Sequence, residues 1–309
     1  MKKTMKEWTV DSPWGEIAMV SWGDPTNPPV LLVHGYMDSA ATFILLVEQL
    51  PDTHYYVGFD MPGHGKSAPF PPGLIVSQLN IVEVIRLVVA HMKWDKFVYL
   101  AHSMGFITGM FYNHIFPGKI TKMVHVDPGP LIGMYYYPYK KPSFWFQYVY
   151  DMYYRSYDKW NASSSKQLTL DEAINLLVRN RSLSEDQAEA VLSRSLVPVG
   201  QGKYKLSWEP RMKKLASVPL SEETLYTVIT QHAPPMLIFE SSENTSAPPG
   251  RKFAASILEK CRLIVPNFTS VTITGGHDIH ITNPESIVPH VKDFFKSAVG
   301  VGNSVKSKL

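Results

Sequence analysis

An α/β fold with a mostly parallel central sheet, helices on both faces and an inserted helical cap is predicted by three features of the sequence. Strand-like and helix-like patterns alternate along most of the chain, which is typical of parallel sheets. Runs such as Val30–Val33 are apolar at every position, as strands covered on both faces must be. Between residues 130 and 234 helix signals continue but strand signals are scarce. The interruption indicates an insertion into the sheet domain.

The individual elements follow from the spacing of apolar residues. Short apolar runs bounded by turn residues predict strands at Glu16–Trp22, Val30–Val33, Tyr55–Phe59, Phe97–Leu100, Lys122–Val126, Met236–Phe239 and Val271–Thr274. Apolar residues spaced three and four apart predict helices at Thr42–Leu50, Ser77–Met92, Gly105–Ile115, Gly250–Lys260 and Glu285–Ala298.

The insertion divides the predicted core into two parts. Residues 1–129 form the first part of the core and residues 130–234 form the cap. Residues 235–300 complete the core, and residues 301–309 form a flexible tail.

Within the predicted cap, two capping boxes mark helix starts, Thr169–Glu172 and Ser184–Gln187. The segment Phe144–Tyr154 is aromatic nearly all round, so one face can pack on the core while another lines a pocket. Ordinary packing between cap and core is the alternative. The aromatic residues expected to contact a substrate are Phe144, Trp145 and Tyr148.

The composition is that of a globular protein with a sizeable core. The chain has 309 residues, of which 45% are apolar, and a formal net charge of +3. Charges of both signs are interspersed, so we expect no nucleic-acid binding. No apolar run approaches the roughly 20 residues of a membrane-spanning helix, and no integral membrane segment is expected. Cys261 is the single cysteine, which favours a reducing compartment.

The tail carries a targeting pattern. Ser307, Lys308 and Leu309 match the peroxisomal address that an import receptor reads at a C-terminus. A chance match of three residues is the alternative. We therefore expect the protein in the peroxisome, with the cytoplasm as a second location.

Ser103 is the expected nucleophile. It lies between an apolar strand and a helical pattern, with small residues two positions before and after it, Ala101 and Gly105. A sharp strand-to-helix turn lifts such a side chain out of the sheet and requires small neighbours. The N–H groups at the start of the following helix favour negative charge at the same place.

A serine hydroxyl needs a base, and His277 is the candidate. It follows a strand-like run and two glycines, which places it at the carboxyl edge of the sheet, where active sites of open α/β folds lie. An ordinary loop histidine is the alternative. His280 lies three residues on, but no Glu has the spacing of a zincin helix, and we expect no metal.

Two backbone N–H groups are expected to stabilise an oxyanion. One belongs to Met104, directly after Ser103, and the other to Tyr36, in a loop where Gly35 permits a sharp turn. A tight turn without any role in ligand binding is the alternative for this loop. The side chains of Tyr36 and His102 are also expected to contact the substrate.

These motifs resemble those of the α/β-hydrolase superfamily in order and spacing, over about residues 15–130 and 235–298. They are His34–Gly35, Asp60–Ser67, His102–Gly105 and Gly276–His277. The segment His34–Phe43 more closely resembles the serine hydrolase-like (kraken-type) branch, whose members often carry peroxisomal tails. The resemblance implies an α/β-hydrolase fold and serine hydrolase activity without a cofactor. Ala101 replaces the first glycine of the family's G-x-S-x-G pattern, and it is small enough for that position.

Two carboxylates, Asp127 and Glu243, are candidates for the acid that supports His277. The family usually places an Asp just after the strand Met236–Phe239, where Asn244 aligns. Asp127 follows the preceding strand, and some superfamily members carry the acid there. Glu243 lies one residue from the usual position and has a longer reach. A turn residue is the alternative interpretation of Asp127, and a site without a working acid is the third.

The expected function is hydrolysis of an ester or thioester of an apolar acyl group, through a Ser-His-acid triad and an acyl-enzyme. The aromatic cap favours an apolar substrate, and acyl-CoA thioesterase is a specific alternative because of the tail. A non-catalytic scaffold that binds an apolar ligand is the alternative of another class. A lyase reaction on the same residues is a third.

Overall fold

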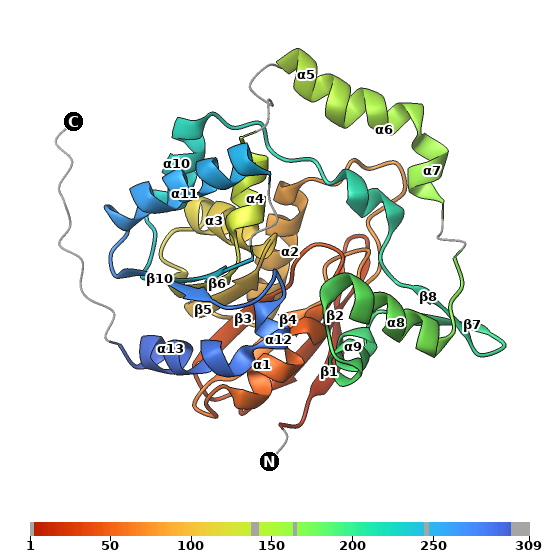
Figure 1. Ribbon diagram of the computed structural model, residues 1–309, viewed down its shortest axis with the longest axis horizontal. Coiled ribbons are helices and arrows are strands. Elements are labelled where there is room, and N and C mark those ends of the chain that lie inside the picture. Colours follow the sequence, from red (N-terminus) through yellow and green to blue (C-terminus); the bar gives the residue numbers. More distant parts are fainter. Residues whose placement is uncertain (1–2, 137–141, 163–165, 244–246, 298–309) are drawn as a thin grey trace.

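The computed structural model describes residues 3–136, 142–162, 166–243 and 247–297 (Figure 1). Its main sheet has eight strands in the order β1-β2-β4-β3-β5-β6-β9-β10. β2 is antiparallel to β1 and β4, and all other neighbours are parallel. The predicted fold class is confirmed. The strands are Lys6–Ser12 (β1), Gly15–Trp22 (β2), Pro29–Val33 (β3), Tyr55–Phe59 (β4), Phe97–His102 (β5), Ile120–Val126 (β6), Met236–Ser241 (β9) and Phe268–Ile273 (β10).

Strand β1 has no counterpart among the predicted elements. It lies at the edge of the sheet and pairs only with β2. Of its seven residues only Val10 is buried, so the strand lacks the continuous apolar run that marks the central strands.

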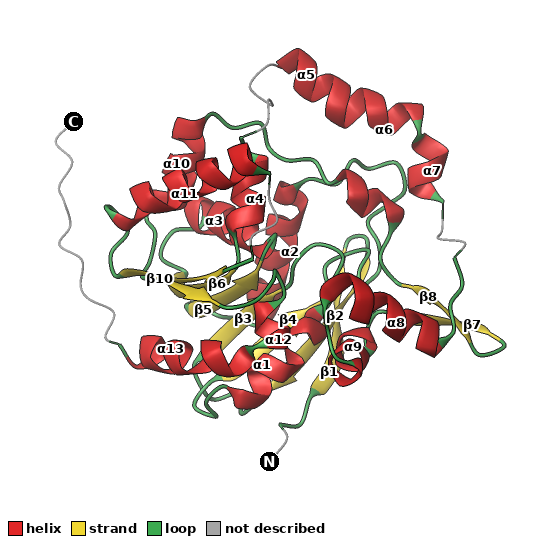
Figure 2. Cartoon of the chain, viewed as in Figure 1, coloured by secondary structure: helices red, strands yellow, loops and turns green. Residues whose placement is uncertain are grey.

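Helices cover both faces of the sheet (Figure 2). One face carries α1 (Ile44–Gln49), α12 (Ile279–Thr282) and α13 (Pro284–Lys296), and the other carries α2 (Gln78–His91), α3 (Gly105–Ile115) and α11 (Pro248–Arg262).

Strand β3 shows why both faces of the sheet must be apolar. Its side chains alternate, so Leu31 and Val33 join the cluster under α2 and α3, while Val30 and Leu32 join the cluster under α13. Burying each such side chain contributes about 1.5–3 kcal/mol.

Two helices at the ends of the predicted cap pack on the helical layer of the core. α4 (Gly129–Met134) lies against α11, and α10 (Glu222–Thr230) contacts α3 and α11. The close approach of α4 and α11 depends on Gly133 and Gly250, because a Cβ on either would lie within 3.0 Å of the other's carbonyl oxygen.

The middle of the insertion forms two separate groups of helices. α8 (Leu170–Arg181) and α9 (Glu185–Leu192) begin at the two predicted capping boxes. They pack on each other, and α9 contacts α1 of the core, where Leu45 of α1 and Ile281 of α12 belong to the same hydrophobic cluster as α8 and α9. A hairpin of β7 (Leu196–Gly200) and β8 (Lys203–Leu206) follows, and then the 3₁₀-helix η3 (Pro210–Lys214).

The aromatic segment forms a nearly continuous helix at the upper edge of the molecule, away from the sheet (Figure 1). It consists of α5 (Pro142–Phe146), the π-helical η2 (Gln147–Asp151), α6 (Met152–Arg155) and α7 (Tyr157–Asn161). Val149 and Tyr153 are buried, whereas most of its aromatic side chains are exposed. Across the described ranges, no helix is both long and apolar enough to cross a membrane.

Candidate active site

Ser103 lies on the turn between β5 and α3 with a backbone φ of +49°, in the left-handed region. A non-glycine residue held there stores about 1–3 kcal/mol of strain, a cost that is typical of functional sites. The turn is crowded, since a Cβ at Gly105 would lie 2.6 Å from the Val33 carbonyl oxygen and 2.9 Å from the Ala101 Cβ. Gly105 is therefore required, whereas Ala101 fits.

Ser103, His277 and Asp127 form a chain of hydrogen bonds. The Ser103 Oγ lies 2.8 Å from His277 Nε2, and His277 Nδ1 lies 2.5 Å from Asp127 Oδ2. The buried Asp127 carboxylate can only accept, so the ring proton lies on Nδ1 and the Nε2 lone pair faces the serine hydroxyl. Asp127 Oδ1 accepts a second bond, from the Ser241 N–H at 3.1 Å, which fixes the carboxylate.

Of the two candidate acids, the structure brings Asp127 to His277 and leaves Glu243 outside the chain. Both ring nitrogens of His277 are already paired, and Glu243 is exposed, with its N–H donating to the Gly275 carbonyl at 3.1 Å. Asp127 reaches the histidine because it directly follows β6, which pairs with β9. Asn244 lies outside the described residues.

The loop that carries Tyr36 is held by two buried histidines. The Met61 N–H donates to His34 Nε2 at 2.9 Å, and His34 Nδ1 donates to the Gly35 carbonyl at 2.7 Å. The Met37 N–H donates to His64 Nε2 at 3.3 Å. Burial lowers the pKa of His64 to about 3, so this ring is neutral and can accept.

The loop that follows β4 serves as scaffold. The buried Asp60 carboxylate accepts bonds from the N–H groups of Ala40 and Lys66 and from the Arg194 guanidinium. A Cβ at Gly65 would lie 2.2 Å from the Asp60 Cγ, so the loop closes around the carboxylate only with glycine. The interior of this loop is thus filled by its own aspartate.

His102 supports the His277 loop. Its Nε2 donates to the His277 carbonyl at 3.0 Å, and its ring packs against those of His277 and His280, at centroid distances of 4.6 and 4.0 Å. Burial holds the pKa of His102 well below its usual value. The ring is therefore a neutral part of the site wall.

A cavity of about 670 Å³ opens above Ser103. Its lining includes the predicted residues Tyr36, His102, Ser103, Met104 and His277. Met104 is the N-cap residue of α3, so its N–H precedes the internal bonds of the helix. The remaining lining residues are Met37, Asp38, Gln78, Pro130, Leu131, Met134, Asn180, Arg181, Met212, Lys213, Leu215, Ser217 and Asp278.

The three aromatic residues predicted to contact substrate are not among those that line this cavity. Phe144 and Tyr148 are 40% and 44% exposed, because their helix faces the core on one side only. Trp145 contacts a lining residue, since its Nε1 donates to the Ser217 carbonyl at 3.0 Å. Among the described residues, methionine and leucine side chains supply the apolar lining instead.

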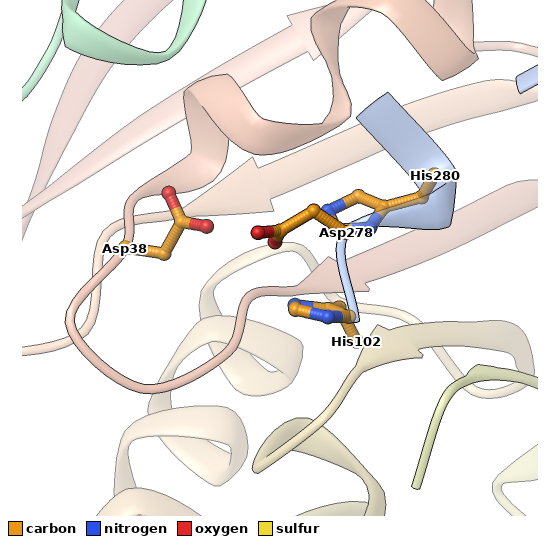
Figure 3. A group of neighbouring side chains, drawn as sticks. All are labelled: Asp38, His102, Asp278 and His280. Atoms are coloured by element: carbon orange, nitrogen blue, oxygen red, sulfur yellow. The ribbon is translucent and has the colours of Figure 1, made fainter. Parts of the chain in front are cut away.

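Sequence reasoning missed Asp38, Arg181 and Asp278. Figure 3 shows Asp38, His102, Asp278 and His280 converging from three segments, with Asp278 and His280 on the same one. They offer ligand atoms within 4.8 Å of one another, as a metal site would. The Arg181 guanidinium, however, donates to both carboxylates, at 2.8 Å to Asp38 and 2.6 Å to Asp278, and supplies positive charge there. Asp278 and Asp38 had a sequence signal, since they lie next to His277 and two residues after Tyr36, whereas Arg181 had none.

Known proteins share this architecture. A family model described as alpha/beta hydrolase fold matches residues 28–156. Solved structures that resemble most of the chain include a hypothetical protein from Pseudomonas aeruginosa, with a TM-score of 0.79 and 21% identity over 94% of this chain and 98% of that one. Another is the thioesterase domain from the curacin biosynthetic pathway, with a TM-score of 0.74 and 19% identity over 93% of this chain and 99% of that one. At these identities the likeness concerns the fold.

Some curated relatives are similar to this chain over most of their length. Serine hydrolase-like protein 2 of Homo sapiens is 29% identical over 301 residues, which cover 92% of this chain and 92% of the relative. A probable serine hydrolase of Drosophila melanogaster is 26% identical, over 95% of this chain and 88% of the relative. Together with the sheet order and the turn at Ser103, these similarities show that the chain has an α/β-hydrolase fold and is similar to proteins named as serine hydrolase-like.

Proposed function

We propose that the protein is a serine hydrolase that cleaves an ester or thioester of an apolar acyl group. The observation that carries the proposal is the chain of hydrogen bonds from Ser103 through His277 to Asp127 beneath a largely apolar cavity. A serine held at φ +49° with its Oγ 2.8 Å from an imidazole nitrogen has the arrangement that nucleophilic catalysis needs.

In the first half-reaction the Ser103 Oγ attacks the acyl carbonyl carbon while His277 Nε2 takes the hydroxyl proton. The carbonyl oxygen becomes an oxyanion, which the N–H groups of Tyr36 and Met104 stabilise. The imidazolium, held by Asp127, then gives its proton to the leaving alcohol or thiol as the bond to the acyl carbon breaks. The acyl group remains on Ser103.

In the second half-reaction His277 Nε2 takes a proton from water, whose oxygen attacks the acyl carbon. The second oxyanion collapses, the Ser103 Oγ leaves with the proton from the imidazolium, and the carboxylic acid departs. Ester and thioester differ only in the leaving atom, so the same residues serve both.

The cavity supports an apolar acyl group. Leu131, Met134, Met212 and Leu215 line it from α4 and the segment around η3. About 670 Å³ lies within the range of sites that hold small molecules. The fold-level similarity to a thioesterase domain keeps acyl-CoA thioesters among the substrates to be tested.

Purified protein is assayed with p-nitrophenyl esters of increasing acyl length and with acyl-CoA thioesters. Turnover that rises with acyl length and disappears in Ser103→Ala supports the proposal. Binding of a fluorescent fatty acid without turnover of any ester would instead favour a non-catalytic scaffold.

We also propose peroxisomal import through Ser307, Lys308 and Leu309. These residues lie outside the described ranges, so the support is their match to the receptor-read signal.

A further inference from the structure

Arg181 is the last residue of cap helix α8, and its guanidinium reaches into the core. Its Nε donates to Asp278 Oδ2 at 2.9 Å and its Nη2 to Asp278 Oδ1 at 2.6 Å. The same Nη2 donates to Asp38 Oδ2 at 2.8 Å. One cap side chain thus holds two carboxylates from different loops of the core (Figure 3 shows the carboxylates).

Each of these carboxylates lies beside a residue of the proposed chemistry. Asp278 directly follows His277, and Asp38 lies two residues after Tyr36. Asp38 is also tied to its own loop, because its Oδ1 accepts a bond from the Ser39 N–H at 2.9 Å. The guanidinium therefore joins the loop of the proposed base to the loop of a proposed oxyanion donor.

The charges make this contact costly to lose. Burial opposes ionisation of Asp38, but the charge and hydrogen bonds of Arg181 outweigh it and hold the pKa of this carboxyl below its usual value. The neighbouring rings of His102 and His280 are buried, and burial lowers the pKa of both, so they add no positive charge near neutral pH. Removing one partner of a buried pair leaves an uncompensated charge.

We infer that Arg181 is a positioning residue, which makes the relative placement of His277 and Tyr36 depend on the docking of α8. The inference rests on the proposed function. A planar guanidinium can grip one carboxylate with two N–H groups while donating to a second, which a lysine ammonium cannot reproduce. Misplacement of catalytic groups by about 1 Å costs on the order of 100-fold in rate.

The test compares Arg181→Ala and Arg181→Lys with Arg179→Ala as the matched control. Arg179 lies on the same helix but is exposed, and its Nε donates to the Asn175 carbonyl within α8. The kcat and KM for a neutral p-nitrophenyl ester are measured against pH, together with thermal unfolding. The Ala variants are then assayed with guanidinium chloride at a sub-denaturing concentration, against sodium chloride of equal ionic strength.

Arg181→Ala is expected to lower kcat about 10- to 100-fold while KM changes little, because the reacting groups rather than the apolar cavity are displaced. Guanidinium restores kcat in this variant and not in Arg179→Ala, an effect that a merely structural residue would not show. The kcat of Arg181→Lys is expected to lie between those of the wild type and Arg181→Ala.

The pH profile provides an independent readout. Among the described residues, the charged or titratable groups in or next to the His277 loop are Asp127, His102, Asp278, His280, Glu243 and Arg181, and Arg181 links Asp278 to Asp38. Without Arg181, the carboxylates of Asp38 and Asp278 are left as uncompensated negative charge beside the site, so the acidic limb of kcat/KM is expected to move to higher pH.

Wild-type kcat and an unchanged pH profile in folded Arg181→Ala would overturn the inference. If Arg181→Ala does not fold, the test uses Arg181→Lys instead. A kcat of Arg181→Lys equal to that of the wild type would then overturn the inference. Failure of the wild type to hydrolyse the ester would instead count against the proposed function itself.

Discussion

Replacing Asp127 with Asn tests which carboxylate supports His277. The Asp127 carboxylate accepts two hydrogen bonds, from His277 Nδ1 and from the Ser241 N–H. An amide has one accepting oxygen and one donating NH₂ group. If the oxygen faces Ser241, the NH₂ faces His277 Nδ1, so the ring proton moves to Nε2 and the ring cannot accept the proton of Ser103. If the oxygen faces His277, the amide NH₂ faces the Ser241 N–H, and two hydrogen-bond donors oppose each other.

The expected loss follows from the wrong tautomer. We expect kcat/KM of Asp127→Asn to fall about 10³- to 10⁴-fold, which corresponds to about 4–5.5 kcal/mol of transition-state stabilisation. Glu243→Gln is the matched control, since Glu243 is exposed and outside the hydrogen-bonded chain, and it should change kcat/KM less than about twofold.

The assay is hydrolysis of a p-nitrophenyl ester at pH 7–8, with thermal unfolding measured on each variant. A larger loss in Glu243→Gln than in folded Asp127→Asn would refute the assignment and return Glu243 to the site.

Three further predictions address the turn, the core and the tail. Gly105→Ala should lower kcat/KM and the unfolding temperature, because the added Cβ would lie 2.6 Å from the Val33 carbonyl oxygen. Ala101→Gly should lower the free energy of unfolding in urea by about 1 kcal/mol or less. Equal effects of the two substitutions would contradict this account of the turn. Burial lowers the pKa of His125 from 6.5 to about 3, so this ring stays neutral when folded and its contribution to stability is lost as the pH falls below 6.5. His125→Leu should therefore reduce the fall in unfolding free energy between pH 7 and pH 5 by about 2 kcal/mol, compared with exposed His91→Gln, and an unchanged fall would argue against a neutral buried ring. Residues 298–309 appended to a fluorescent protein should give punctate localisation that disappears without the last three residues, and diffuse fluorescence with the full tail would contradict the targeting signal.

The central elements of the fold could be predicted because their signals are local. Buried parallel strands are apolar on both faces, and the turn around Ser103 must have small neighbours, so both are visible in short windows of sequence. Strand β1 has only one buried residue and escapes the same criterion.

The sequence limits the acid that supports His277 to two candidates, Asp127 and Glu243, but does not distinguish between them. Which carboxylate reaches His277 depends on the pairing of β6 with β9 and on the path of the chain after each strand. Such geometry joins residues 150 positions apart, Asp127 and His277, and leaves no local pattern.

The cap was the least predictable part. The starts of α8 and α9 could be predicted because each begins with a capping box. The orientation of the aromatic helix could not be predicted, because its sequence is aromatic nearly all round and marks no inner face. Phe144 and Tyr148 are exposed rather than in the cavity. Arg181 contacts Asp38, which lies 143 residues away in the sequence. Arginines at the ends of amphipathic helices are mostly exposed to solvent, so the sequence does not mark this one as buried in the site.

Labelling with a fluorophosphonate tests the central proposal most directly, because the reagent bonds to an activated serine. Intact mass analysis of the wild type should show one adduct, and peptide mapping should place it on Ser103. Ser103→Ala should remain unlabelled, and His277→Ala should react far more slowly because the hydroxyl loses its base. Folded wild-type protein that stays unlabelled, or an adduct that persists in Ser103→Ala, would contradict the role proposed for this serine.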